Sequence, residues 1–237
     1  MTIESRIKKY WDERSEDFGK FRRIELEGIS AAVWENFLTA DLPAGDSLKI
    51  LDVGTGAGFF AAILSRRGHK VTGVDMSPKM IDEAKKLFRD IKLDAEFFVM
   101  DAQNLKFDDA TFDAVVTRNL TWTLPDVMSA YREWYRVLKV GGVLINFDSD
   151  YGNRNFNRGN SGVSGDVTDK MLDECTAIKN SLRISTHTRP QFDAEFLTEL
   201  GFKVQCDFDI SASVHIDKNV PYDSTPLFKI CAKKKDT

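Results

Sequence analysis

Three glycines on alternate positions, Gly54, Gly56 and Gly58, stand between two apolar segments of different periodicity. Residues 48–53 predict a buried strand, and residues 57–66 predict an apolar helix. A strand, a glycine turn and a helix in this order open a nucleotide-binding α/β unit. Glycine tolerates the backbone angles of so tight a turn, and its missing side chain lets a ligand lie against the main chain. This stretch therefore predicts a ligand site and constrains the fold around it.

The segments that follow continue this alternation of strand and helix. Ser77 and Pro78 have the sequence of a helix N-cap followed by its first helical position. Strands joined by helices imply right-handed parallel crossovers, and hence a doubly wound, Rossmann-like sheet. The predicted strands are residues 48–53, 70–74, 95–100, 112–117 and 143–147, and the predicted helices between them are residues 57–66, 78–88 and 126–138.

The region before this core is helical and aromatic. Residues 3–20 predict a helix on which Tyr10, Arg14 and Phe18 share one face. Residues 24–39 predict a second helix. We expect these helices to pack on the core.

The region after the core departs from the alternation. Residues 149–190 begin rich in Gly, Asn and Ser and include a helical stretch at 166–181, which indicates a lid or substrate insertion. Two later strands, 202–210 and 227–233, are joined by a long linker and can pair antiparallel. We expect one domain, with a helical cover at 1–45, a ligand-binding core at 46–148, the insertion at 149–190 and C-terminal strands at 191–237.

Composition narrows the class of protein. The 237 residues carry a net charge of −4, which weighs against a nucleic-acid partner. No apolar run approaches the roughly 18 residues that a membrane helix needs. Cys175, Cys206 and Cys231 are too widely spaced for a zinc site or a disulfide framework, so a reducing cytoplasm is the expected setting. The sequence indicates no metal site and leaves the oligomeric state open.

The spacing of the glycines separates possible ligands. A dinucleotide fingerprint needs Gly-x-Gly-x-x-Gly, whereas here the third glycine comes one residue early and Phe59 follows it. Asp75 lies 21 residues after Gly54, where a carboxylate can accept both hydroxyls of a ribose. Asp52 places negative charge where a pyrophosphate would be repelled. We therefore expect an adenosine ligand with a cationic centre and no phosphate.

Five segments in order resemble the class I S-adenosylmethionine-dependent methyltransferases, and together they cover about residues 48–147. Within this family the chain is most similar to small-molecule methyltransferases of the menaquinone-biosynthesis type. The resemblance implies a seven-stranded sheet with an antiparallel last strand, and S-adenosylmethionine as cofactor. The matching segments are Leu51–Phe59, Val74–Met80, Asp101–Leu105, Phe112–Val116 and Arg136–Leu144.

The resemblance also implies roles for individual residues. Asp75 would bind the ribose, Met76 would pack on the adenine, and Asp101 with the Ala102 amide would bind the adenine edge. Arg118 would lie beside the methionine, and an aromatic side chain of the N-terminal helix could face the sulfonium. The implied cofactor site comprises Tyr10, Trp11, Phe18, Asp52, Gly54, Thr55, Gly56, Gly58, Asp75, Met76, Asp101, Ala102, Arg118.

The sequence indicates less about the methyl acceptor than about the cofactor. In-line methyl transfer needs positioning, and it needs a base only when the nucleophile arrives protonated. His187 is the candidate base, because its ordinary pKa lies near neutrality. The candidate acceptor residues are Asn119, Trp122, Tyr151, Arg189 and Tyr222.

Three hypotheses for function follow. The first is a methyltransferase with a small-molecule acceptor. The second is an RNA or protein methyltransferase, for which Arg154, Arg158, Arg183 and Arg189 could provide a basic surface. The third is a non-catalytic or NAD-binding Rossmann-like protein, against which the glycine spacing and Asp52 argue.

Overall fold

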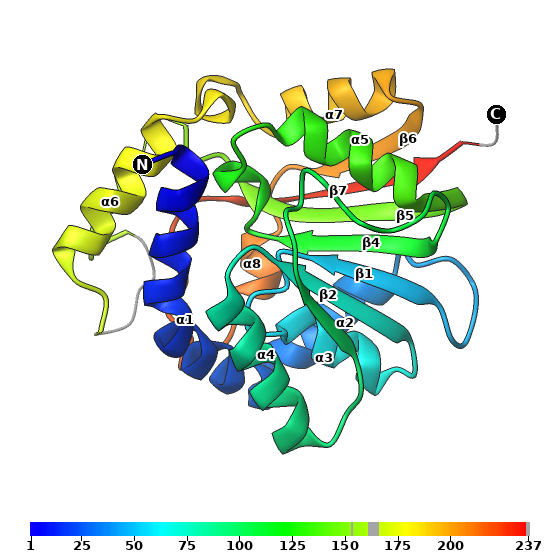
Figure 1. Cartoon of the computed structure of the whole chain (residues 1–237), viewed down its shortest axis with the longest axis horizontal. Helices are drawn as coiled ribbons and strands as arrows, with labels where there is room; N and C mark the ends of the chain where they lie inside the picture. The colour runs from blue at the N-terminus through cyan, green and yellow to red at the C-terminus, as the bar shows by residue number, and fades with distance from the viewer. Residues whose placement is uncertain (153, 161–165, 236–237) are drawn as a thin grey trace.

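A mixed sheet runs through the centre of the molecule in the computed structural model, which describes residues 1–152, 154–160 and 166–235 (Figure 1). The described residues form seven strands in the order β3-β2-β1-β4-β5-β7-β6. All neighbours are parallel except at β7, which lies antiparallel between β5 and β6. The strands are β1 Lys49–Val53, β2 Lys70–Asp75, β3 Glu96–Val99, β4 Phe112–Arg118, β5 Leu138–Ser149, β6 Phe202–Asp207 and β7 Leu227–Lys234. The predicted doubly wound sheet and its antiparallel last strand are confirmed.

Helices cover both faces of the sheet, and two more lie at one end of it. In Figure 1, α5 and α7 lie above the sheet, α2, α3 and α4 lie below it, and α1 crosses the strand ends beside α6. The helices are α1 Ile3–Glu27, α2 Ser30–Thr39, α3 Phe59–Arg66, α4 Pro78–Ile91, α5 Val127–Val137, α6 Asp169–Asn180, α7 Gln191–Glu199 and α8 Ser211–Val214, with short 3-10 turns η1 Thr121–Thr123 and η2 Arg183–Thr186. The core is correspondingly split between the two faces.

Several boundaries differ from the sequence predictions. Helix α1 continues to Glu27, and the amide of its C-cap residue Gly28 donates to the Ile24 carbonyl, so residues 24–27 belong to the first helix and not, as predicted, to the second. Strand β5 begins at Leu138, five residues before its predicted start, because the pairing with β4 shifts register around Gly141, which has a φ of +76°. The sequence predictions did not include α8. Part of the predicted insertion, residues 153 and 161–165, lies outside the described residues.

Trp34 anchors the lower face of the sheet. Its side chain is fully buried, and its ring meets those of Phe60 and Phe147 with centroids 5.4 and 5.2 Å apart. These three rings join α2, α3 and β5. Aromatic contacts of this kind contribute both buried area and edge-to-face attraction.

We expect Trp34→Ala to lower the free energy of unfolding by about 3–5 kcal/mol, because it leaves a cavity among packed rings. Urea denaturation followed by circular dichroism measures this. Val140→Ala is the control, since Val140 is 56% exposed and its removal should change the value by less than about 0.5 kcal/mol. Equal losses in the two variants would contradict the assignment of Trp34 to the core.

Candidate functional site

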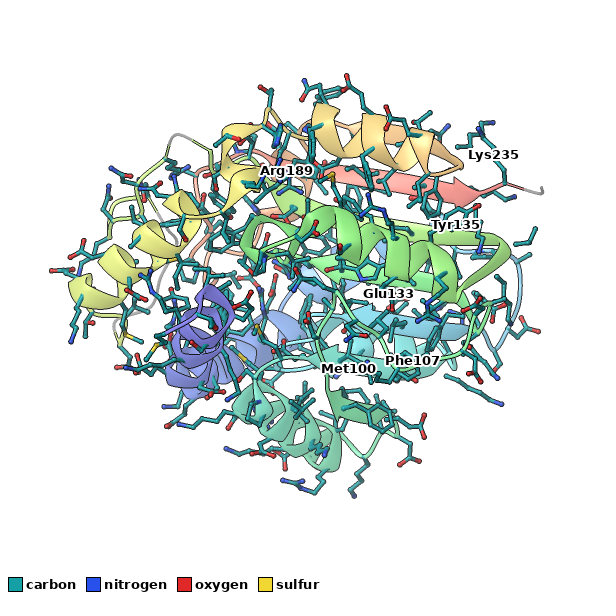
Figure 2. All side chains as sticks on the ribbon, turned by 45° about the horizontal axis from the view of Figure 1, so that its top comes forward. Met100, Phe107, Glu133, Tyr135, Arg189 and Lys235 are labelled. Atoms are coloured by element: carbon teal, nitrogen blue, oxygen red, sulfur yellow. The ribbon has the colours of Figure 1, made fainter. Side chains whose placement is uncertain are left out.

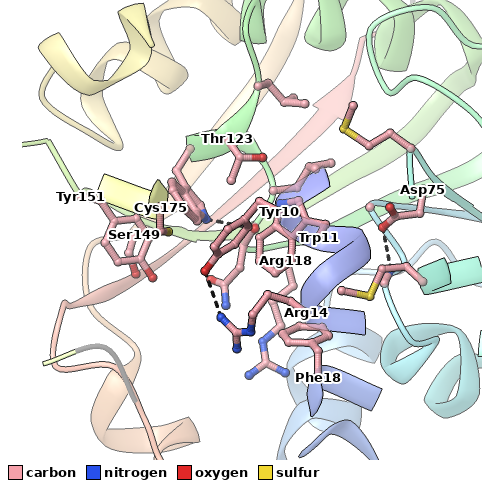
Figure 3. Close-up of a pocket in the computed structure, with 18 of the residues that line it drawn as sticks. Tyr10, Trp11, Arg14, Phe18, Asp75, Arg118, Thr123, Ser149, Tyr151 and Cys175 are labelled. Atoms are coloured by element: carbon pink, nitrogen blue, oxygen red, sulfur yellow. Dashed lines mark hydrogen bonds between the residues drawn. The ribbon is translucent and has the colours of Figure 1, made fainter. Parts of the chain in front are cut away.

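A cavity lies at the carboxyl ends of the parallel strands, with α1 covering it (Figure 3). Parallel strands direct their ends to one edge of the sheet, which is where open α/β sheets bind ligands. The cavity extends from Asp75 and Asp101 at one end to Ser149 and Tyr151 at the other. Side chains from α1 and from the segments around α6 and α8 complete its walls.

The glycine turn forms part of the cavity wall. Gly54 and Gly56 have φ angles of +67° and +53° and line the cavity. A Cβ on Gly56 would come 3.2 Å from the Phe18 ring, so glycine keeps this surface open. Gly58, with a φ of +85°, faces α4 instead, since a Cβ there would lie 3.2 Å from the Cβ of Ala84. Gly54 and Gly56 therefore form part of the cavity wall, whereas Gly58 allows the turn to pack closely on α4.

Asp52 and Thr55 lie behind the turn and do not line the described part of the cavity. The Asp52 carboxylate is 2% exposed and accepts hydrogen bonds from the Thr55 hydroxyl at 2.6 Å and the Ala61 amide at 3.1 Å. Burial raises the pKa of Asp52 to about 7. The expectation that Asp52 presents its charge to the ligand is corrected: this side chain fastens the glycine turn to α3.

Asp75 presents a carboxylate at the end of β2. Its oxygens accept the amides of Gly56 at 3.0 Å and Ser77 at 2.9 Å, and the side chain lines the cavity. Burial raises the pKa of Asp75 to about 6. Each oxygen retains a lone pair for a further donor. Met76 also lines this end.

Asp101 and Ala102 continue this wall beyond β3. Asp101 accepts the amide of Gln103 at 2.9 Å, and the Ala102 carbonyl accepts the Trp134 indole N–H at 3.0 Å. Both residues line the cavity together with Gln103. The structure therefore brings Gly54, Gly56, Asp75, Met76, Asp101 and Ala102 to one surface.

Helix α1 presents a stripe of side chains to the cavity. Tyr10, Arg14, Phe18 and Arg22 recur every four residues and all line it, with Trp11 beside them. Trp11 meets Tyr10 and Phe18 edge-on, with ring centroids 5.2 and 5.7 Å apart. The predicted aromatic seam thus faces the cavity.

Glu25 ties the end of α1 to the sheet. It is fully buried and accepts Arg118 Nη2 at 2.9 Å, the Trp34 indole at 3.1 Å and Arg22. Burial alone would raise the pKa of Glu25, but Arg118 and Arg22 outweigh it and hold the pKa at about 2. Two guanidinium groups sharing one carboxylate leave an excess positive charge beside the cavity. Arg118 also has a buried Nε without a hydrogen-bond partner among the described residues.

Aromatic side chains form the end of the cavity opposite Asp75. The rings of Trp122, Tyr151 and Phe156 meet with centroids 5.0–5.4 Å apart. Ser149 and Cys175 complete this end (Figure 3). Asn119 lines the cavity with a left-handed backbone, φ +54°, and its carbonyl accepts the Trp122 indole N–H at 3.1 Å. Tyr222 also lines the cavity and stacks on His215 at 4.3 Å.

Besides Asp52, Thr55 and Gly58, two further predicted site residues lie outside the cavity lining. Arg189, labelled in Figure 2, is buried and donates to Asp193 at 2.8 Å and Thr121 at 2.6 Å, so its side chain lies behind the described cavity wall. His187 stacks on Phe192 with centroids 3.9 Å apart, also outside the described lining.

Sequence reasoning missed several cavity residues. Arg22 extends the Tyr10–Phe18 spacing by one more turn, so the periodicity that was noted could have found it. The pairing of Glu25 with Arg118 joins positions 93 apart and leaves no local signal.

Among the described residues, no group of three His, Cys, Asp or Glu side chains is placed to hold a metal ion. The described helices include none with the length and apolarity to cross a membrane.

Known proteins resemble this chain in sequence. Residues 51–146 match the Methyltransferase domain family. The chain is 38% identical over 118 residues to the ubiquinone/menaquinone biosynthesis C-methyltransferase of Desulfotalea psychrophila, covering 49% of this chain and 47% of that relative. It is 32% identical over 139 residues to the demethylmenaquinone methyltransferase of Thermotoga maritima, covering 58% of each. The chain therefore spans about half the length of the curated relatives it matches.

A solved structure extends the likeness to the whole fold. The S-adenosylmethionine-dependent methyltransferase of Aquifex aeolicus superposes with a TM-score of 0.60 at 18% identity, covering 94% of this chain and 97% of that one. At this identity the likeness concerns the fold. Together with the sequence matches, it confirms the resemblance that the five segments indicated.

We expect Glu25→Ala to lower the free energy of unfolding by about 3–5 kcal/mol, because it leaves two buried guanidinium groups without their carboxylate. Urea denaturation gives this value. Glu13→Ala is the control, since Glu13 pairs with Lys9 at 3.8 Å in an exposed position, and it should cost less than about 0.5 kcal/mol. A loss no larger than that of the control would refute the role of Glu25.

We expect the raised pKa of Asp52 to make stability fall as pH rises. With a folded pKa of about 7 against an ordinary value of 3.8, the folded chain binds more protons than the unfolded chain between these values. Relative to Asp52→Asn, which cannot ionise, the wild type should lose unfolding free energy from pH 5 to 8, by up to about 1.4 kcal/mol per pH unit. Denaturation at several pH values measures the difference. Parallel curves for the two proteins would show that the Asp52 pKa is not raised.

Proposed function

We propose that this chain, which carries a methyltransferase domain at residues 51–146, binds S-adenosylmethionine in the cavity and transfers its methyl group to a small-molecule acceptor. The observation that carries the proposal is the shared surface of Gly54, Gly56, Asp75 and Asp101 beneath the aromatic and cationic face of α1. An adenosine with a cationic, phosphate-free extension fits this combination.

The cavity residues fit the cofactor along its length. Asp75 has free lone pairs for the ribose hydroxyls, and Asp101 with Met76 lines the region for the adenine. The surface of Gly54 and Gly56 gives the methionine a path along the main chain. The excess positive charge of Arg22 and Arg118 around Glu25 suits the methionine carboxylate. We assign no cofactor contact to Asp52, Thr55 or Gly58.

Positioning supports the transfer itself. When bound, S-adenosylmethionine supplies an electrophilic methyl group on a sulfonium. Tyr10 and Trp11 offer ring faces that attract such a cation by about 0.5–2 kcal/mol. Buried aromatic walls exclude water and hold the acceptor in line, which in favourable cases contributes up to roughly 7–11 kcal/mol. No side chain needs to form a covalent bond.

The shape of the opposite end favours a compact acceptor. Trp122, Tyr151 and Phe156 present apolar rings, and the relatives' names include quinone and hydroquinone methyltransferases. We infer a planar ring of this class, methylated on carbon. S-adenosylmethionine would supply the methyl group and keep the electron pair of the broken C–S bond, while the ring carbon would bond the methyl with its own electron pair and lose its proton to water.

The arginines proposed for a macromolecular acceptor support that alternative poorly. Arg154 is held by Asn160 and Ser224, and Arg158 by Asp169 and Val167. Arg189 is buried.

The three cysteines are free thiols, which agrees with the reducing cytoplasm that we propose as the compartment.

We expect S-adenosylmethionine to bind the wild type in calorimetry, and Asp75→Ala to weaken it at least tenfold, or about 1.4 kcal/mol, through the lost ribose contact. Asp113→Ala is the matched control, because Asp113 accepts the Lys49 amide at 2.8 Å at the opposite edge of the sheet. It should leave the affinity unchanged. No binding to the wild type at millimolar ligand would overturn the proposed function, and equal affinities in folded variants would overturn the role of Asp75.

A further inference from the structure

Arg14 lies midway along the cavity and has weaker partners than the other cavity arginines. It is 8% exposed, and its Nη1 donates to the Tyr10 hydroxyl at 3.0 Å (Figure 3). Its contact with Asp17 is 3.4 Å long, against 2.9 Å for the closest contact of Arg118 with Glu25. The buried Nε of Arg14 has no hydrogen-bond partner among the described residues. This nitrogen can therefore donate to a bound molecule.

The position of Arg14 along α1 separates it from the cation pair at Glu25. Arg22 is eight residues further along the same face, which corresponds to about 12 Å of helix. Phe18 lies between them against Gly56. Arg22 therefore lies toward the end of α1 that Glu25 ties to Arg118, and Arg14 lies one turn beyond the glycine surface.

Arg14 lies beside residues of the aromatic end of the cavity, the end formed by Trp122, Tyr151 and Phe156. Its partner Tyr10 interacts with Cys175 of α6, and Cys175 lines the same end as Ser149 and Tyr151 (Figure 3). The charged and titratable groups around it are Tyr10 and Asp17 on α1, Cys175 on α6, Arg118 at the end of β4 and Asp223 before β7. Burial raises the pKa values of Tyr10 and Cys175, that of Cys175 to about 11, so neither supplies a counter-charge near neutral pH.

We propose that Arg14 binds an anionic oxygen of the acceptor, so that the acceptor is a phenol- or enol-type molecule held in its ionised form. This inference rests on the proposed function. The Nε–H of Arg14 donates to the oxygen, and Tyr10 supports the guanidinium from the other side. The same chemistry would also suit the methionine carboxylate, so the test separates these two sources.

An ionised oxygen beside Arg14 makes the adjacent ring carbon of the acceptor more nucleophilic. The acceptor hydroxyl releases its proton to water, and the negative charge spreads onto the adjacent ring carbon. That carbon then bonds the methyl, the C–S bond breaks toward sulfur, and loss of the ring proton restores the aromatic system. A guanidinium beside the oxygen stabilises the anion.

The test uses 4-nitrophenol, whose ionised form absorbs visible light, as a probe of the full chain saturated with S-adenosylhomocysteine. We expect the pKa of the bound probe to be lower by about one unit in the wild type than in Arg14→Gln. Arg14→Lys, which keeps the charge, should retain at least half of this shift. Arg89→Gln removes an exposed charge on α4 and should leave the wild-type value unchanged. Circular dichroism verifies folding, and Arg14→Met replaces the Gln variant if that variant does not fold.

Calorimetry of S-adenosylhomocysteine on the same variants completes the test. An affinity within threefold of wild type in Arg14→Gln, with the probe pKa shift lost, supports the acceptor site. An unchanged probe pKa, or no probe binding to the wild type at millimolar concentration, overturns it. So does a tenfold loss of S-adenosylhomocysteine affinity without a probe shift, which would assign Arg14 to the methionine carboxylate. If S-adenosylhomocysteine fails to bind the wild type, the proposed function fails, and titration of the probe without it still decides the role of Arg14.

Discussion

The buried carboxylate of Glu25 is the contact on which the arrangement of the site depends. It joins the end of α1 to Arg118 after β4 and to Trp34 of α2. Removing the cationic partners would leave a buried carboxylate without a counter-charge, which destabilises the fold. Removing the carboxylate would do the same to each cation. The cover helix, the strand end and the lower helical layer therefore keep one fixed relation. The glycine turn lies within this frame, since Phe18 of α1 packs against Gly56.

Because one end of α1 is fixed, the helical repeat places the side chains of one face at regular distances along the cavity. Counting back from Glu25, successive turns place Arg22, Phe18, Arg14 and Tyr10 at increasing distance from the cation pair. Charge and aromatic surface thus alternate along the cover at intervals of about 6 Å. A long ligand lying under α1 would meet these groups in order.

Local patterns predicted the strand ends well because each depends on neighbours in sequence. Alternating glycines and apolar runs suffice to place Gly54, Asp75 and Asp101 at one sheet edge. Local patterns do not predict the direction of a side chain. Asp52 has the same place in the sequence whether its side chain faces a ligand or, as found, Thr55 and Ala61. Arg189 likewise required knowledge of Asp193 and Thr121, since only the packed layers determine that its charge is buried.

The cavity is built from residues both inside and outside the matched family segment. Residues 51–146 carry the glycine turn and the strand-end acids Asp75 and Asp101, and also Trp122 at the aromatic end. Arg14, Tyr151 and Cys175 lie outside that segment and line the other end of the cavity. The aromatic end therefore joins Trp122 of the matched segment to side chains that lie outside it, so its shape depends on both parts of the chain.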